Sequence, residues 1–306
     1  MKLMNIALSA ATGIALLTGS IATAANGISD EDMACYKKAV SMQTEADELG
    51  FEGFRIADYP VVFNDSKHDY VVHTDGNTDK RDPVISTFAA TAYENNGSFE
   101  VIVPTKSSMG TLAVMMGGEW DEAHQASTIW HEAFHCYQLT NFRGNIEGLT
   151  EGHTFSQNDF SEKLINDEYA KNEKAKQLFT EELELLSKAA EENDIDKLRE
   201  DMVKYKELDT GRRELISEDA QTLENYYTIV EGSAFYVEMM MTKALSGETF
   251  EKEYAGRLTD FAEGSSKYYS LGGAQCLLLD KIDSEWKAEY DFSEPMSELI
   301  FEKLGV

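Results

Sequence analysis

Two histidines and a glutamate share one short segment, His131-Glu132-Ala133-Phe134-His135, in a chain that has six histidines in all. Residues four apart in an α-helix lie one turn apart on the same face, so both imidazoles can reach one metal ion. Glu132 is offset around that helix and can act as a general base toward a water molecule. The spacing is the HExxH pattern, which predicts a zinc site with two nitrogen ligands, an open position and a base.

The residues around this motif predict a helix from Asp121 to Leu139 that is buried on one side. No proline or glycine interrupts the stretch, an aspartate favours its start, and three aromatic residues recur at helical spacing, namely Trp130, Phe134 and Tyr137. The alternative is a pair of core histidines beside an exposed glutamate. Two histidines on a buried face would each need a polar partner, which favours the metal site.

A catalytic zinc takes three protein ligands, so a third must lie elsewhere in the chain. Two glutamates compete for this role. Glu151 follows the motif after a short interval, whereas Glu231 lies far downstream in the middle of a long predicted helix. Gly232 and Ala234 follow Glu231, and such small residues allow a second helix to approach closely. We expect that second helix to be the motif helix.

The first 24 residues have the features of a secretory signal peptide. Lys2 supplies a positive charge, residues 6–17 an apolar run, and Ala22-Thr23-Ala24 a small-residue cleavage site. The apolar run is too short to span a membrane convincingly. We therefore expect an exported protein, periplasmic or secreted, that has no membrane association after cleavage.

The chain carries 56 acidic and 27 basic residues, a formal net charge of −29. Such a charge repels nucleic acid and anionic membranes, which excludes them as partners. The sequence also has no nucleotide-binding loop and no nucleophile elbow. Of the three cysteines, Cys35 and Cys276 are the better candidates for a disulfide, while Cys136 reads as a small buried apolar residue.

The order of elements predicts an α+β fold that is mainly α. After a helix over residues 30–49, short β-rich runs separated by turn residues predict a small mixed or antiparallel sheet, with runs at Val61–Phe63, Tyr70–His73, Val84–Phe88, Phe99–Val103 and Thr111–Met116. After the motif, the sequence pattern predicts helices almost throughout, including an acidic helical hairpin inserted into this helical half at about residues 156–209. Further helices are expected at 219–245, 249–262, 267–282 and 295–304.

The motif together with the later segment Glu-Gly-Ser-Ala-Phe-Tyr at 231–236 resembles the gluzincin metallopeptidases. The resemblance covers roughly residues 99–286, apart from the insertion, and implies one zincin-like catalytic domain over residues 25–306. It implies that His131, His135 and Glu231 bind Zn²⁺ and that Glu132 is the base. The run at 111–116 resembles the substrate-binding edge strand of that group. The chain departs from the thermolysin-like and large aminopeptidase patterns, in which the glutamate follows sooner and an acidic residue replaces Phe235.

A further resemblance concerns the donor that stabilises the oxyanion. The segment Tyr-Tyr-Ser-Leu-Gly-Gly at 268–273 is similar to the Tyr-x-x-Gly segment of gluzincin aminopeptidases, which implies that Tyr269 is this donor. Tyr227, one turn before Glu231, is the rival. Three polar residues spaced two turns from the motif or from Glu231 are candidates to support the ligands or line the site, namely His124, Gln138 and Glu238.

These features predict an exported zinc-dependent peptidase that hydrolyses peptide or protein substrates. One alternative is a zinc-binding protein without peptidase activity, either a hydrolase of another amide or an inactive scaffold. The intact Glu132 argues against an inactive scaffold. A second alternative is a metal-free interaction protein that uses the acidic helical hairpin.

Overall fold

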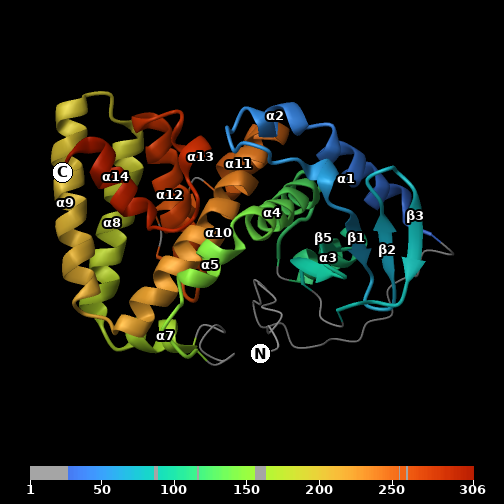
Figure 1. Ribbon diagram of the computed structural model, residues 1–306, viewed down its shortest axis with the longest axis horizontal. Coiled ribbons are helices and arrows are strands. Elements are labelled where there is room, and N and C mark those ends of the chain that lie inside the picture. The colour runs from blue at the N-terminus through green and yellow to red at the C-terminus, as the bar shows by residue number, and fades with distance from the viewer. Residues whose placement is uncertain (1–26, 86–88, 116, 156–162, 255, 260) are drawn as a thin grey trace. The chain divides into compact units, whose positions relative to one another are not determined.

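The computed structural model describes residues 27–85, 89–115, 117–155, 163–254, 256–259 and 261–306 (Figure 1). The expected signal peptide, residues 1–24, lies outside the described residues. The protein is α+β and mainly α, with 63% of it helical and a five-stranded sheet N-terminal to a helical half, which confirms the predicted fold class. The chain forms two compact units. Of the described residues, the first unit comprises those within 27–49, 53–140 and 240–246, and the second those within 50–52, 141–239 and 247–306.

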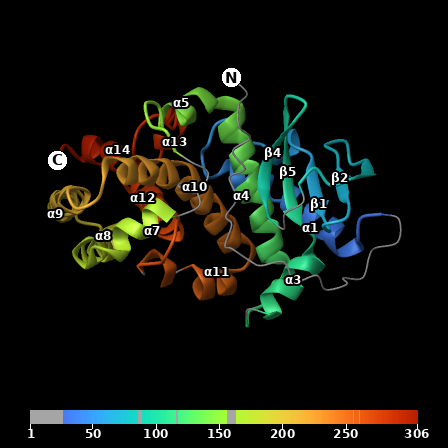
Figure 2. The same cartoon turned by 90° about the horizontal axis from the view of Figure 1, so that it is seen from below.

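The first unit contains a mixed sheet in the strand order β3-β2-β1-β5-β4 (Figure 2). Its strands are β1 (Val61–Asn64), β2 (Asp69–Val72), β3 (Thr78–Arg81), β4 (Thr91–Asn95) and β5 (Ser98–Pro104). β1 and β5 run parallel, and the other neighbours run antiparallel. Val62 lies opposite Val71 on one side and Ile102 on the other, and these three residues form an apolar core cluster. The apolar side chains of β1, β2 and β5 therefore explain why these three strands were predictable.

Two strands and one irregular segment differ from the sequence prediction. β3 and β4 were not expected as strands, although the turns beside them were. Gly76 (φ +82°) lies in the turn that connects β2 to β3, and Asn96 and Gly97 (φ +53° and +85°) form the turn that connects β4 to β5. Backbone with positive φ at these positions favours tight hairpin turns. Val84 and Ile85, predicted to begin a strand, are irregular but pack against the sheet core. Residues 86–88 lie outside the described residues.

The helices of the first unit are α1 (Asp30–Val40), α2 (Gln43–Asp47), α3 (Lys106–Met115) and α4 (Glu122–Asn141). The helix expected over residues 30–49 is broken between α1 and α2. The strand expected at 111–116 is wrong, because the described residues of that run belong to α3. Lys106 N–H donates to Asp32 at 2.7 Å and Ser108 N–H donates to Thr105 Oγ1 at 3.4 Å, which caps α3 and starts the helix.

The second unit is helical throughout its regular elements. They are α5 (Arg143–Gly148), α7 (Lys163–Ala170), α8 (Glu173–Glu191), α9 (Ile195–Arg213), α10 (Glu218–Leu245), α11 (Gly247–Glu253), α12 (Ser266–Ile282), α13 (Trp286–Glu289) and α14 (Met296–Leu304). The last turns of α10 belong to the first unit. The predicted helical hairpin is formed by α8 and α9, and α10, α12 and α14 match their predicted ranges closely. α11 ends before its predicted end and is followed by a short 3₁₀ turn at Gly256–Leu258.

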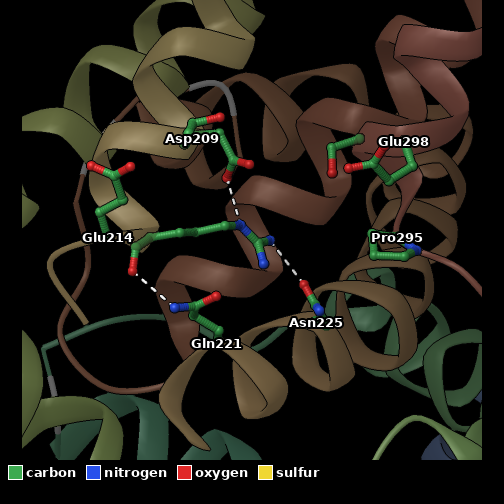
Figure 3. A pocket seen from close by; sticks show the side chains of 9 residues that line it. Asp209, Glu214, Gln221, Asn225, Pro295 and Glu298 are labelled. Carbon is green, nitrogen blue, oxygen red and sulfur yellow. Dashed lines mark hydrogen bonds and ion pairs between the residues drawn. The ribbon is translucent and has the colours of Figure 1, made fainter. Parts of the chain in front are cut away.

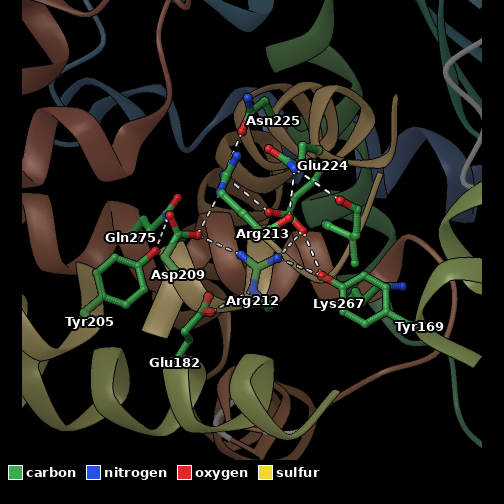
Figure 4. A network of polar contacts seen from close by, with 12 residues as sticks. Tyr169, Glu182, Tyr205, Asp209, Arg212, Arg213, Glu224, Asn225, Lys267 and Gln275 are labelled. Atoms are coloured by element: carbon green, nitrogen blue, oxygen red, sulfur yellow. Dashed lines mark hydrogen bonds and ion pairs between the residues drawn. The ribbon is translucent and has the colours of Figure 1, made fainter. Parts of the chain in front are cut away.

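A buried network of charges ties α10 to the hairpin (Figure 4). Arg212 on α9 donates to Glu182 on α8 at 2.7 Å, to Asp209 at 2.8 Å and to Glu224 on α10 at 2.6 Å. Tyr169 on α7 also donates to Glu224, at 3.0 Å. The side chains of Arg212, Glu182 and Glu224 are fully buried. Removing Arg212 or Glu224 would leave an uncompensated buried charge, so the network fixes α10 relative to α7, α8 and α9.

Two further features bear on the sequence expectations. Cys35, Cys136 and Cys276 are buried free thiols, so the candidate disulfide between Cys35 and Cys276 is not formed. Among the described residues, no helix combines the length and the apolar character needed to cross a bilayer.

Candidate metal centre

α4 presents the HExxH motif because its other face is anchored by aromatic packing. Asp121 accepts a hydrogen bond from the His124 N–H at 2.9 Å and so caps the start of the helix. Further along, three aromatic rings surround Phe54 at centroid distances of 5.1 to 5.5 Å, namely Trp130, Phe134 and Tyr137. These are the three residues whose spacing predicted the buried side of the helix. With that side held, the rotation of the helix and the direction of the motif are fixed.

The two motif histidines converge on one point. His131 Nε2 and His135 Nε2 lie 3.1 Å apart, and both side chains are buried. His135 Nδ1 lies 2.8 Å from Gln138 Oε1. Because an amide oxygen only accepts, this contact places the proton of His135 on Nδ1 and leaves the lone pair of Nε2 directed at the convergence point.

Glu231 joins the two histidines. His131, His135 and Glu231 each place one possible ligand atom in a group whose atoms all lie within 4.8 Å of one another. All three residues are buried. Glu231 is only 2% exposed. The rival Glu151 is exposed in a turn after α5 and is not part of such a group in the described residues. Glu231, the glutamate implied by the family resemblance, is therefore the one grouped with the motif histidines.

The donor set fits a zinc ion. Two nitrogens that each bind zinc at about 2.0–2.1 Å, with a tetrahedral N–Zn–N angle, lie about 3.3 Å from each other. The two Nε2 atoms of His131 and His135 lie 3.1 Å apart, close to this distance. Two imidazoles and one carboxylate are a ligand set of catalytic zinc sites, which leave the fourth position open. Burying a carboxylate next to two imidazoles is costly without a compensating charge, and a cation at this point would provide it.

Glu132 occupies the position expected of a base. It is 5% exposed on α4, about 100° around the helix from His131, and so does not point the same way as the two imidazoles. A carboxylate in this position can take a proton from a water molecule near the convergence point without competing for the metal.

The close approach predicted at Gly232 exists, but α12 makes it rather than the motif helix. A Cβ atom built on Gly232 would lie 2.6 Å from the Cα of Gly272 on α12. This contact brings the segment that contains Tyr268 and Tyr269 against α10 near Glu231. Tyr269 is 8% exposed and makes an edge-to-face ring contact with Phe235 at 6.2 Å, whereas Tyr268 is fully buried and stacks on Tyr227 at 6.2 Å.

The three supporting candidates have different surroundings. Gln138 contacts His135, as described above. His124 instead pairs with Asp121 at the start of α4, with Nδ1 2.7 Å from Oδ1. Glu238 accepts a hydrogen bond from the Tyr254 hydroxyl at 2.7 Å. Only Gln138 is therefore shown in contact with a predicted ligand.

The buried network around Arg212 was not anticipated from the sequence. Its signal is the Arg212-Arg213 pair, two adjacent cations at the end of α9. Burial raises the pKa of Glu182 to about 8, although Arg212 opposes the shift. Burial acts on Glu224 in the same direction, but Arg212 and Arg213 together outweigh it and hold the pKa of Glu224 below its ordinary value.

Comparison with protein families, with curated proteins and with solved structures finds no match for this chain.

Proposed function

We propose that this protein is an exported zinc-dependent peptidase of gluzincin type. The observation that carries the proposal is the buried group of His131, His135 and Glu231. The HExxH motif supports it independently, because it supplies a base next to the ligands. The contact between His135 and Gln138 adds support, since ligating histidines usually donate their second ring N–H to a neighbouring acceptor.

Each residue has a definite task in this proposal. His131 and His135 would hold the ion through Nε2, and Glu231 would hold it through a carboxylate oxygen. When bound, zinc supplies a Lewis acid that polarises a carbonyl and makes a water molecule more acidic. Glu132 accepts the proton of the attacking water and can pass it to the departing amine. The Tyr269 hydroxyl donates to the carbonyl oxygen as negative charge develops there.

Metal analysis of the purified mature protein tests the site. We expect about one zinc per chain in the wild type and loss of zinc in the double variant His131→Ala, His135→Ala. Full zinc occupancy in the double variant would contradict the motif. A protein with no zinc after dialysis against zinc would favour the metal-free interaction protein.

Hydrolysis of a peptide library tests the reaction. Glu132→Gln keeps the shape of the side chain and removes the base, so it should retain zinc and lose activity by several orders of magnitude. Unchanged cleavage by Glu132→Gln would contradict the mechanism. A zinc-loaded wild type that cleaves no peptide in the library would point to another amide or to a scaffold.

A further inference from the structure

A second site is formed where α9, α10 and α14 meet in the second unit (Figure 3). It is a cavity of about 380 Å³, within the size range of small-molecule pockets. Its lining is polar and carries both signs of charge, with Arg213, Asn225, Ser297 and Glu298 among the lining residues. None of His131, His135 or Glu231 lines it, so it is separate from the candidate metal centre.

Arg213 is the cationic residue of the pocket lining. Its Nε donates to Asp209 at 2.9 Å and its Nη2 donates to Asn225 at 2.8 Å, so the plane of the group is fixed. Nη1 makes no hydrogen bond to any residue in the described ranges, and the side chain is 22% exposed. A fixed guanidinium with a nitrogen still available is suited to bind a carboxylate.

The first turn of α14 adds donors on another wall. Pro295 is the N-cap of this nine-residue helix, and the N–H groups of Met296 and Ser297 have no acceptor in the described part of the chain. The Ser297 side chain lines the pocket and is 3% exposed, yet its hydroxyl has no hydrogen-bond partner within the described residues. Unpaired N–H groups at a helix N-terminus favour an anion, and the Ser297 hydroxyl, which has no partner among the described residues, is available as a further donor.

The pocket also carries a negative charge for a cationic group. Glu298 is exposed, forms no ion pair with the described residues, and lies across the pocket from Glu214 in Figure 3. Arg213 already pairs with Asp209 and with Glu224, so what it offers a ligand is the donor Nη1, while Glu214 and Glu298 are two exposed carboxylates of the lining. A small ligand with a carboxylate for these donors and an ammonium group for Glu298 matches this lining.

We propose that this pocket binds a small zwitterion of the amino acid class, either a free α-amino acid or a short peptide. Its carboxylate lies between Arg213 Nη1, the Ser297 hydroxyl and the N–H groups that begin α14. Its ammonium group pairs with Glu298. The proposal stands on the pocket alone and does not depend on whether the protein is a peptidase.

Calorimetric titration of the full mature protein, dialysed against a chelator, tests the proposal. The probes are leucine and the dipeptide Gly-Leu, which separate a free amino acid from a short peptide. Leucinamide lacks the carboxylate and N-acetyl-leucine lacks the ammonium group. We expect one of the two zwitterions to bind one per chain, and its blocked analogues to bind at least about tenfold more weakly, because each loses a charged hydrogen bond.

Variants tie the binding to this pocket. Glu298→Gln removes an exposed charge and Ser297→Ala removes the buried hydroxyl, and each should weaken the zwitterion at least about tenfold. Glu200→Gln is the matched control, because Glu200 is an exposed residue of α9 that does not line the pocket. Arg213→Gln would also break the contact with Asp209, so unfolding of that variant decides nothing, whereas Glu298→Gln and Ser297→Ala do. Wild-type affinity in both Glu298→Gln and Ser297→Ala would overturn the proposal. So would the absence of binding heat when the wild type is titrated with either zwitterion to about 10 mM, a concentration that reveals even weak binding.

Discussion

Gly232 on α10 and Gly272 on α12 meet backbone to backbone. A Cβ atom on Gly272 would lie 2.4 Å from the carbonyl oxygen of Thr228 and 2.6 Å from the Cα of Gly232. No side chain fits at either position unless the two helices separate. The contact lies one residue after Glu231 and three residues after Tyr269, so the glycines set how these two functional candidates are placed relative to each other.

Gly272→Ala should therefore destabilise the protein by about 1–3 kcal/mol or more, because the added methyl group collides with backbone that cannot give way locally. Gly211→Ala is the matched control. Gly211 lies within α9, nothing is within 4 Å of its added Cβ, and alanine should raise stability there by up to about 1 kcal/mol. Urea unfolding of both variants measures the difference, and equal effects of the two substitutions would contradict the packing.

Glu231→Ala should abolish zinc binding, whereas Glu151→Ala should leave it intact. Glu231 is buried in the group with the two histidines, and Glu151 is exposed in a turn. Zinc content after gel filtration in metal-free buffer measures this. The opposite result, with zinc retained in Glu231→Ala and lost in Glu151→Ala, would transfer the third ligand to Glu151.

Gln138→Ala should weaken zinc binding by about tenfold to a hundredfold, because His135 loses the acceptor that orients its ring. Gln138→Glu keeps an acceptor oxygen and should restore most of the affinity. Competition with a coloured chelator gives the dissociation constants. Gln177→Ala, an exposed glutamine on α8, serves as the control. A wild-type constant in Gln138→Ala would show that the contact does not support the ligand.

Tyr269→Phe should lower kcat by roughly a hundredfold to a thousandfold with little change in KM, as expected for a donor used in the transition state. Tyr268→Phe should have a much smaller effect on kcat, because the Tyr268 ring is fully buried and stacked on Tyr227. Steady-state kinetics on a peptide substrate compares the two variants. Small and equal effects would assign both tyrosines to the core and leave Tyr227 as the next candidate.

Glu182 should make stability depend on pH. Burial raises the pKa of Glu182 to about 8 from an ordinary value of 4.5, so between these pH values the folded chain holds a proton that the unfolded chain has released. Its contribution to the free energy of unfolding is therefore complete below about pH 4.5, falls as pH rises, and is lost above about pH 8. Glu182→Gln should flatten this fall, which urea unfolding at a series of pH values would measure.

The neighbouring Glu184, exposed on α8, provides the control, since Glu184→Gln should keep the wild-type pH profile. Glu182 differs from Glu224 in its partners. Among the described residues, Glu182 pairs with one arginine, Arg212, whereas Glu224 contacts two arginines and a tyrosine. An unchanged slope in Glu182→Gln would mean that Glu182 is ionised in the folded chain.

The elements that could be predicted are those whose own residues determine them. α4 follows from apolar spacing, and β1 and β5 follow from apolar runs. β3 consists of the polar residues Thr-Asp-Lys-Arg, and it becomes a strand because it pairs with β2 and because Arg81 reaches Asp69 and Glu100. α3 depends on a hydrogen bond to Asp32, which lies 74 residues earlier in the chain. Such distant partners leave no local pattern in the sequence.

In the candidate site, too, only the features that depend on local sequence could be predicted. His131 and His135 lie on one helix, so their spacing alone predicts that they converge. The residues alone left Glu151 and Glu231 open as the third ligand, because sequence does not reveal burial directly. Gly232 was correctly expected to meet another helix, but the sequence pattern could not identify Gly272 as its partner. The pocket between α9, α10 and α14 is lined by side chains from all three helices, so no linear motif marks it in the sequence.

The three buried thiols have a practical consequence. Because Cys35, Cys136 and Cys276 are free thiols, the protein does not need an oxidising compartment or a redox couple to refold. Burial raises the pKa of Cys35 to about 12 and the pKa values of Cys136 and Cys276 well above their ordinary range, so all three resist alkylation in the folded state. Each thiol thus reports the opening of its own helix, since Cys35 lies on α1, Cys136 on α4 beside His135, and Cys276 on α12. Mass spectrometry of the alkylated chain would read the three opening rates separately in a single experiment.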